Sequence, residues 1–181
     1  MQKYFPAQTP QIFDLRPFPP YNKRVMTIRR ALESDIPQIG RLLCQTLNLH
    51  RSVRPDIFKA NAKKYSDGEL KAKINDYNER IFVAAEGEKV LGYAFCVIQN
   101  HKGSNILNAI KTLYIDDLCV DEPERGKGVG SALLEYAYGH AKSCGCYNVT
   151  LNVWAGNVGA EEFYARCGYT PQKTTLEKII E

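Results

Sequence analysis

The segment from Val120 to Gly130 carries three glycines at alternate positions, after an apolar run and before a helical one. These glycines are Gly126, Gly128 and Gly130. Glycine lets the backbone turn tightly and approach a ligand without interference from a Cβ atom. The N–H groups at a helix N-terminus form an anion site, most naturally for phosphate. Arg125 and Lys127 add positive charge, so we predict a phosphate site, with a turn that binds nothing as the alternative.

The common phosphate-binding motifs are absent from this loop. No Gly-Lys-Ser/Thr ends it, as the Walker A motif requires, and the G-x-G-x-x-G dinucleotide pattern is missing. The next predicted strand, Asn148–Val153, does not end in the acidic residue that would hold a ribose. The spacing therefore argues against ATP and NAD as the ligand.

Hydrophobic periodicity divides the chain after Met26 into strands and helices. The expected strands are Thr27–Arg30, Ile81–Ala85, Val90–Ile98, Lys111–Val120, Asn148–Val153 and Tyr169–Ile180. The first expected helix starts at a cap on Ser34 or Asp35, and a weaker helical region follows up to about Asn75. A third helix is expected at Val129–Ser143, and a fourth from a cap at Asn157 to Gly168. This order predicts a single α/β domain with a mixed sheet, antiparallel early and with a right-handed crossover later.

Residues 1–25 differ in composition from the rest of the chain. Five prolines fall within the first twenty positions and no periodicity is sustained, so we expect a poorly ordered N-terminal extension. The alternative is an arm that packs on the domain or on a partner. Residues 26–181 form the expected domain.

Composition limits the classes of function. The net charge of +4 is mild and the basic residues are scattered, without a basic face carrying interleaved aromatics, so we expect no nucleic-acid partner. No apolar stretch approaches membrane-spanning length and no signal peptide is visible, which predicts a cytoplasmic protein without a membrane partner. Six cysteines include the Cys144–Cys146 pair but no C-x-x-C, and we expect no metal site.

The glycine loop and two other segments resemble the GNAT superfamily of N-acetyltransferases. Arg125 to Gly130 is similar to its R-x-x-G-x-G/A motif, and Leu118 to Val120 is similar to the strand that pairs with pantetheine. Asn157 and the run Phe163 to Tyr169 resemble its downstream N…(F/L)Y-x-x-x-G-(F/Y) motif. The resemblance covers about residues 26–181. It implies a centrally split β-sheet flanked by helices, and acetyl-CoA as co-substrate.

The resemblance also implies roles for individual residues. The backbone amides from Gly126 to Gly130 would cradle the pyrophosphate, Asn157 would contact the cofactor arm, and Tyr164 would lie near the sulfur. The implied cofactor-binding residues are Leu118, Cys119, Val120, Arg125, Gly126, Lys127, Gly128, Val129, Gly130, Ser131 and Asn157. Tyr164 could donate a proton to the leaving thiolate, because it is a phenol; the alternative is packing beside Phe163.

Two adjacent carboxylates stand in the apolar run Tyr114–Val120. Strand alternation would send Asp116 and Asp117 to opposite faces. The run resembles the diamine acetyltransferase branch, in which the acidic pair lines the amine site. By that resemblance Asp117 contacts the substrate and Asp116 activates it, directly or through water. The alternative is a solvent-facing or salt-bridged pair at a strand edge.

The sequence constrains the acceptor-binding residues less than the cofactor-binding residues. His50 and Arg54 lie in a polar stretch, His50 to Asp56, where the family's variable acceptor loop falls. They either contact the substrate or belong to a solvated connection between two helices. Trp154 either lines the cleft or packs. Asn152 stands where N-terminal acetyltransferases of ribosomal proteins carry a glutamate base, which argues against that branch. We expect acetyl transfer to a small cationic primary amine. A protein or peptide N-terminal acetyltransferase and a non-catalytic acyl-CoA-binding module are the alternatives, and a homodimer is left open.

Overall fold

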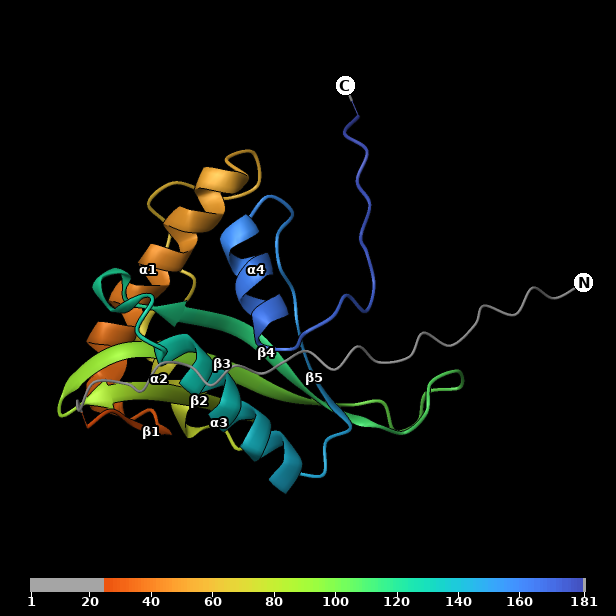
Figure 1. The fold of residues 1–181 in the computed structure, drawn as a ribbon, viewed down its shortest axis with the longest axis horizontal. Coiled ribbons are helices and arrows are strands. Elements are labelled where there is room, and N and C mark those ends of the chain that lie inside the picture. The colour runs from red at the N-terminus through yellow and green to blue at the C-terminus, as the bar shows by residue number, and fades with distance from the viewer. Residues whose placement is uncertain (1–24, 181) are drawn as a thin grey trace, which may run out of the picture.

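The computed structural model describes residues 25–180. Within them, a five-stranded mixed sheet has the order β1-β2-β3-β4-β5. The strands are β1 (Thr27–Arg30), β2 (Glu79–Glu86), β3 (Lys89–Asn100), β4 (Lys111–Val120) and β5 (Asn148–Leu151). The helices are α1 (Ile36–Val53), α2 (Asp67–Asn75), α3 (Val129–Ser143) and α4 (Val158–Arg166), with short 3₁₀ turns at η1 (Glu33–Asp35) and η2 (Glu122–Glu124). Neighbouring strands are antiparallel except β4 and β5, which pair in parallel and are linked by α3 (Figure 1). The predicted mixed α/β domain is therefore confirmed.

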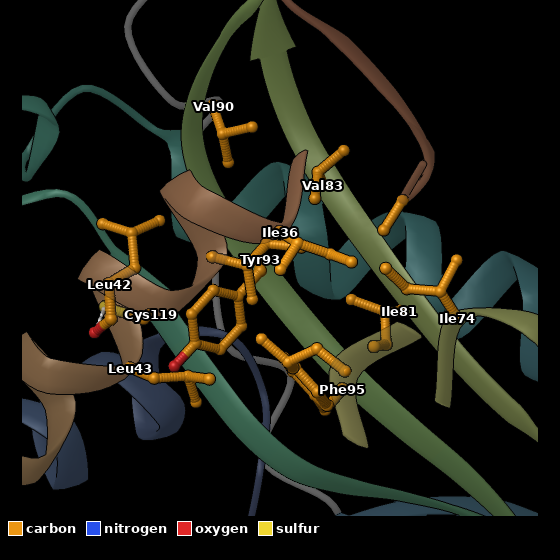
Figure 2. Packing of buried hydrophobic residues seen from close by; sticks show 13 residues of the cluster. Ile36, Leu42, Leu43, Ile74, Ile81, Val83, Val90, Tyr93, Phe95 and Cys119 are labelled. Carbon is orange, nitrogen blue, oxygen red and sulfur yellow. Dashed lines mark hydrogen bonds between the residues drawn. The ribbon is translucent and has the colours of Figure 1, made fainter. Parts of the chain in front are cut away.

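The sheet separates two hydrophobic clusters. One cluster joins α1 and α2 to one face of the sheet, and Tyr93 lies in it among Leu42, Leu43 and Phe95 (Figure 2). The other cluster joins α3 to the opposite face, where Leu133 and Ala137 are fully buried. Because both faces are covered, the central strands are buried along much of their length, as their continuous apolar runs predict.

Asp35 is the N-cap residue of α1, as expected, but its side chain makes no capping hydrogen bond to that helix. The Asp35 carboxylate accepts a hydrogen bond from the Leu32 N–H at 2.7 Å and two from the Arg29 guanidinium at 2.7 and 2.9 Å. It therefore secures η1 to β1, and α1 begins one residue later with Pro37 in its first turn. At its other end α1 continues to Val53, so His50 is helical and lies outside a connecting loop.

A β-bulge in β4 overturns the expected alternation of the acidic pair. Phe95 of β3 pairs with Asp117 and Cys96 pairs with Ile115, so Asp116 is an extra residue. Ile115 and Leu118, three positions apart, both pack on the α3 side. The two aspartates between them therefore share the side covered by α1 and α2, and the prediction of opposite faces was wrong.

β4 and β5 separate after a short paired stretch. The pairs run from Thr112 with Asn148 to Ile115 with Leu151, and β4 then continues to Val120 paired with β3 alone. This produces the centrally split sheet that the family resemblance implied. Since β5 ends at Leu151, two residues before its expected end, the β5-side edge of β4 has no strand partner beyond Ile115 within residues 25–180.

The expected last strand, Tyr169–Ile180, is absent. These residues have no helix or strand and lead away from the sheet (Figure 1). Leu176 and Ile180 are 89% and 93% exposed, because no second layer covers them. Apolar content alone thus misled the prediction, since a strand also needs a neighbouring edge to pair with. The expectation for residues 1–25 lies almost wholly outside the described residues.

Candidate active site

The glycine loop has the backbone geometry of an anion site. Gly126 and Gly128 have φ angles of 75° and 82°, in the left-handed region that favours glycine. A Cβ atom at either position would meet nothing within 4 Å, so this side of the loop faces open space. Gly128 is the N-cap of α3, and the Ala132 N–H to Gly128 C=O bond of 3.0 Å opens the helix. The N–H groups of residues 129–131 precede that bonding and are available to a ligand.

Internal ion pairs hold the loop in place. The buried Glu124 carboxylate lies 2.7 Å from the Lys89 ammonium and 3.0 Å from that of Lys127. Hydrogen bonds from Lys89 and Lys127 lower the pKa of Glu124 to about 2, so it stays ionised. The Lys127 charge therefore serves Glu124 and is not free for phosphate. Arg125 folds back, with its Nε donating to the Val120 carbonyl at 3.2 Å, and the rest of its guanidinium is exposed.

The third glycine has a packing role. A Cβ atom on Gly130 would meet Phe163 Cζ at 3.0 Å and Val120 Cγ2 at 3.4 Å. Gly130 thus allows α3, α4 and β4 to approach closely, and the Ser131 hydroxyl lies 3.9 Å from the Cys167 thiol across the same contact. Val129 is buried in the adjoining core. The loop, the split in the sheet and α4 are joined at this point.

α4 places Asn157 and Tyr164 beside the split. Asn157 caps the helix as expected, with its Oδ1 accepting from the Ala160 N–H at 3.3 Å, and Gly168 ends it at a φ of 84°. The half-buried Tyr164 ring packs 5.2 Å from the Phe163 ring. Burial, and after it the charge of Asp117, raise the pKa of Tyr164, so its phenol stays protonated at neutral pH. The hydroxyl has no hydrogen-bond partner among the described residues, which leaves it free to donate.

The acidic pair is bound by a lysine that the sequence did not single out. Lys64 Nζ lies 3.0 Å from Asp116 Oδ2 and 2.9 Å from Asp117 Oδ2. The Asp117 side chain is only 4% exposed, and its Oδ1 accepts from the Tyr93 hydroxyl at 3.1 Å. The Asp116 side chain is 33% exposed, and the Tyr65 hydroxyl is 3.3 Å from its Oδ2. Asp117 is thus fully engaged, while Asp116 keeps an oxygen available.

Electrostatics favour a permanently charged Lys64. Burial lowers its pKa, but the nearby Asp117 and Asp116 carboxylates outweigh that effect and leave the pKa raised. The contact joins residues that are 52 and 53 positions apart in the chain. Nothing in the sequence around Lys63 and Lys64, between two helices, predicts the contact of Lys64 with the acidic pair. The hydrogen bond from the Tyr93 hydroxyl, in its buried strand, is likewise not predictable from the sequence.

Aromatic side chains form a wall beside the acidic pair. The Phe58 ring lies 5.1 Å from His50 and 5.3 Å from Trp154, so these two predicted acceptor residues contact the same ring. Burial lowers the pKa of His50, while Asp117 raises it and Lys64 lowers it further. His50 is therefore neutral at pH 7 and within electrostatic reach of the pair. Trp154 is 37% exposed, which is consistent with a cleft wall.

The third predicted acceptor residue, Arg54, is already occupied. Its guanidinium lies 2.6 Å from Asp56 and 2.9 Å from Glu177, and over the Trp154 ring at 5.9 Å. It therefore secures the wall and the C-terminal segment more readily than it contacts a substrate. Asn152 donates from its Nδ2 to the Tyr114 hydroxyl at 3.0 Å, in place of the glutamate base of the N-terminal branch.

A small cavity of about 150 Å³ adjoins Asp116 on the side of α2. Its lining combines two aromatic rings with two cationic and two anionic side chains. The lining residues are Tyr65, Lys73, Glu79, Arg80, Ile81, Phe95, Cys96, Val97 and Asp116. Lys73 and Glu79 form an internal pair at 2.8 Å, so the cavity holds little uncompensated charge.

A split sheet with a glycine loop at a helix N-terminus defines the class of acyl-group transferases with the GNAT fold. The chain belongs to the acetyltransferase (GNAT) family, because the sequence model of that family matches residues 46–169. Acetyl-CoA is the acetyl donor that this family generally uses. In the described part of the chain, no helix is long and apolar enough to cross a membrane. Likewise, residues 25–180 contain no group of three or more His, Cys, Asp and Glu side chains able to hold a metal ion.

Individual relatives match the chain over different shares of its length. A glucosamine 6-phosphate N-acetyltransferase of Arabidopsis thaliana is 34% identical over 74 residues, 41% of this chain and 48% of that protein. An uncharacterised N-acetyltransferase of Methanocaldococcus jannaschii is 32% identical over 146 residues, 81% of this chain and 61% of that protein. A mutant BH1408 protein from Bacillus halodurans superposes with a TM-score of 0.82 at 29% identity, over 86% of this chain and 99% of that one. The chain spans less than half the length of the first curated relatives it matches.

Proposed function

We propose that this chain transfers the acetyl group of acetyl-CoA to a primary amine that is cationic in solution. The acidic pair carries the proposal. Asp116 and Asp117 lie together on one side of β4, and an ammonium group, that of Lys64, binds both. Two carboxylates close to each other favour a cation between them, since their mutual repulsion is relieved when one binds.

The glycine loop and the β4 edge supply a suitable binding site for acetyl-CoA. The open side of Gly126 and Gly128 leaves room for a pyrophosphate against the N–H groups of residues 129–131. Arg125 offers the exposed positive charge there, while Lys127 secures the loop through Glu124. Backbone groups of Leu118, Cys119 and Val120, on the edge that β5 leaves, would pair with the pantetheine arm, and Asn157 Nδ2 remains available beside it. Acetyl-CoA supplies an activated thioester when bound.

The chain's own residues would then handle two protons. Asp116 has an available oxygen and is partly exposed, so it holds the acceptor and takes the proton that an ammonium must lose before it attacks. Asp117 is buried, and before an acceptor binds, its carboxylate is bound by Lys64 and the Tyr93 hydroxyl. This assignment reverses the roles that the family resemblance suggested. The Tyr164 phenol, kept protonated by its raised pKa, donates to the departing thiolate.

An acceptor screen tests the proposal. The protein is incubated with acetyl-CoA and polyamines, amino acids, aminoglycosides or peptides, and thiol release is measured against a reaction without acceptor. We expect small cationic amines to give the fastest acceptor-dependent release. Release with peptides alone would exclude the small-amine acceptor and favour N-terminal acetylation. Tight acetyl-CoA binding without release on any acceptor would make the chain a non-catalytic binding module.

A further inference from the structure

Lys64 occupies the place that the proposed acceptor needs. Its ammonium lies within 3.0 Å of a carboxylate oxygen of both Asp116 and Asp117. A primary ammonium on a substrate carries the same charge and the same three N–H donors. One ammonium therefore satisfies the pair, and a second cannot make the same contacts while Lys64 remains.

The Lys64 side chain is able to leave without unfolding its surroundings. It belongs to the connection between α1 and α2, which forms no helix or strand from Arg54 to Ser66. The side chain is 34% exposed, so its ammonium can reach water by rotation of its flexible stem. The neighbouring Tyr65 is fixed by stacking on Phe95 at 5.8 Å, which keeps the backbone in place while Lys64 moves.

The other groups that face Lys64 do not replace its charge. His50 from α1 is neutral at pH 7, and Tyr93 and Tyr65 present hydroxyl groups to the two carboxylates. Lys73 is directed to Glu79, to which it donates at 2.8 Å. When Lys64 leaves, the pair therefore carries two uncompensated negative charges that only an incoming cation can balance.

We propose that Lys64 is an internal competitor for the acceptor site, and that a cationic amine binds by displacing it from Asp116 and Asp117. This inference rests on the proposed function, because it assumes that the acceptor's ammonium binds the acidic pair. Lys64 thereby determines specificity: an acceptor must be cationic enough to replace it, and uncharged amides or alcohols gain nothing at this position.

Kinetics of Lys64→Met test the competition. We expect the KM for 1,4-diaminobutane to fall about three- to tenfold, because the acceptor no longer displaces an internal cation, while the KM for acetyl-CoA is unchanged. Lys63→Met is the matched control: Lys63 is on the same connection and lies 3.9 Å from Asp67, away from the pair. An active, folded Lys64→Met protein with an unaltered or higher KM for the diamine would overturn the proposal.

A second measurement uses the unmodified protein and needs no catalysis. Reductive methylation with formaldehyde and cyanoborohydride is followed by mass spectrometry, with and without butylguanidine, a cation that has several N–H donors and, like an arginine side chain, is not itself methylated under these conditions. Displacement predicts faster methylation of Lys64 when butylguanidine is present, and no change at Lys63, at constant ionic strength. Unchanged or slower methylation of Lys64 would refute displacement. Absence of acetyl transfer to every amine would instead count against the proposed function, and the two failures are thus distinguishable.

Discussion

Asp116 and Asp117 are neighbours in sequence with different surroundings. The Asp117 side chain is nearly inaccessible and accepts from Lys64 and the Tyr93 hydroxyl, whereas one third of the Asp116 side chain is exposed. A buried carboxylate that accepts hydrogen bonds from an ammonium group and a hydroxyl group contributes to the stability of the fold as well as to the site. Asp117 therefore also holds the local structure, whereas Asp116 is the more accessible of the two to an acceptor.

Substitution of each aspartate by asparagine should reveal this difference. We expect Asp117→Asn to lower the free energy of unfolding by about 1–3 kcal/mol, because Lys64 and Tyr93 lose a buried ionic partner. Asp116→Asn should change stability by less than about 0.5 kcal/mol and raise the KM for a cationic amine. Urea unfolding and steady-state kinetics measure the two effects. Equal stability losses in both variants would contradict the assignment.

Tyr164 is the second residue whose chemistry depends on its surroundings. Tyr164→Phe removes one oxygen and keeps the packing on Phe163. We expect kcat to fall about 100-fold, at the lower end of what a positioned acid contributes, since water partly substitutes. Because the interaction forms only in the transition state, kcat/KM should fall equally while the KM for acetyl-CoA stays constant.

Tyr169→Phe provides the control for Tyr164, because its ring lies 5.8 Å away and the change removes the same atom. This variant should keep the wild-type kcat. A Tyr164→Phe protein with wild-type kcat would make Tyr164 a packing residue.

At the scale of elements, the hairpin and α3 could be predicted, and the bulge could not. Gly87 in the turn and continuous apolar runs identified β2 and β3, because turn chemistry and periodicity are local properties. Asp116 is an extra residue relative to β3, which depends on pairing between strands and leaves no mark in a single strand's pattern. The Lys64 contact was equally invisible, because it depends on the path of a long connection. The expected strand at 169–180 is absent for the same reason, because whether a segment pairs depends on the strands beside it as well as on its own sequence.

The loop before α3 is the element whose substitution is most informative. Gly128→Val places a branched side chain at a φ of 82°, which costs about 1–2 kcal/mol in stability, and fills the open side of the loop. We expect acetyl-CoA binding, measured by calorimetry, to be lost. Gly87→Val controls for strain: its φ of 58° is also left-handed and its Cβ would also meet nothing within 4 Å. That variant should be similarly destabilised and bind normally; loss of binding in both would mean that strain alone is responsible.

The junction of α1 with the end of β4 should make stability depend on acid pH. Arg41 and Gln45 hydrogen-bond the buried Asp121, and Arg41 chiefly lowers the pKa of Asp121 to about 2. Because the folded pKa lies below the unfolded value, the contribution is present above about pH 4 and is lost as the pH falls to about 2.

Arg41→Met should therefore lower the free energy of unfolding by about 1–2 kcal/mol at pH 7, since Arg41 is half exposed and screened by water. The loss should be smaller at pH 3 than at pH 7. Urea unfolding at both pH values measures it, and an equal loss at both would show that the ion pair does not contribute through ionisation.

At the scale of the whole molecule, one side of the split sheet holds the glycine loop and the other holds the acidic pair. The glycine loop and α3 lie on the side of the second hydrophobic cluster, while Lys64 and the aspartates lie on the side of α1 and α2. A donor that enters through the split from one side would thus meet an acceptor bound from the other. Such an arrangement favours direct transfer within one complex, since both reactants can be held at once.

Ligand-linked stabilisation tests the donor half of this arrangement. Acetyl-CoA at 100 times its dissociation constant should add about 2.7 kcal/mol to the free energy of unfolding. For a domain of this length, that corresponds to a rise in Tm of about 5–10 °C. NAD and ATP at equal concentration should give little shift, because the loop lacks the lysine-serine end of a Walker motif and the spacing of a dinucleotide fold. Differential scanning fluorimetry measures all three, with Gly128→Val expected to lose the acetyl-CoA shift. A shift with NAD or ATP that equals that of acetyl-CoA would show that the loop recognises phosphate without the pantetheine arm, and the β4 edge would then have no role in binding.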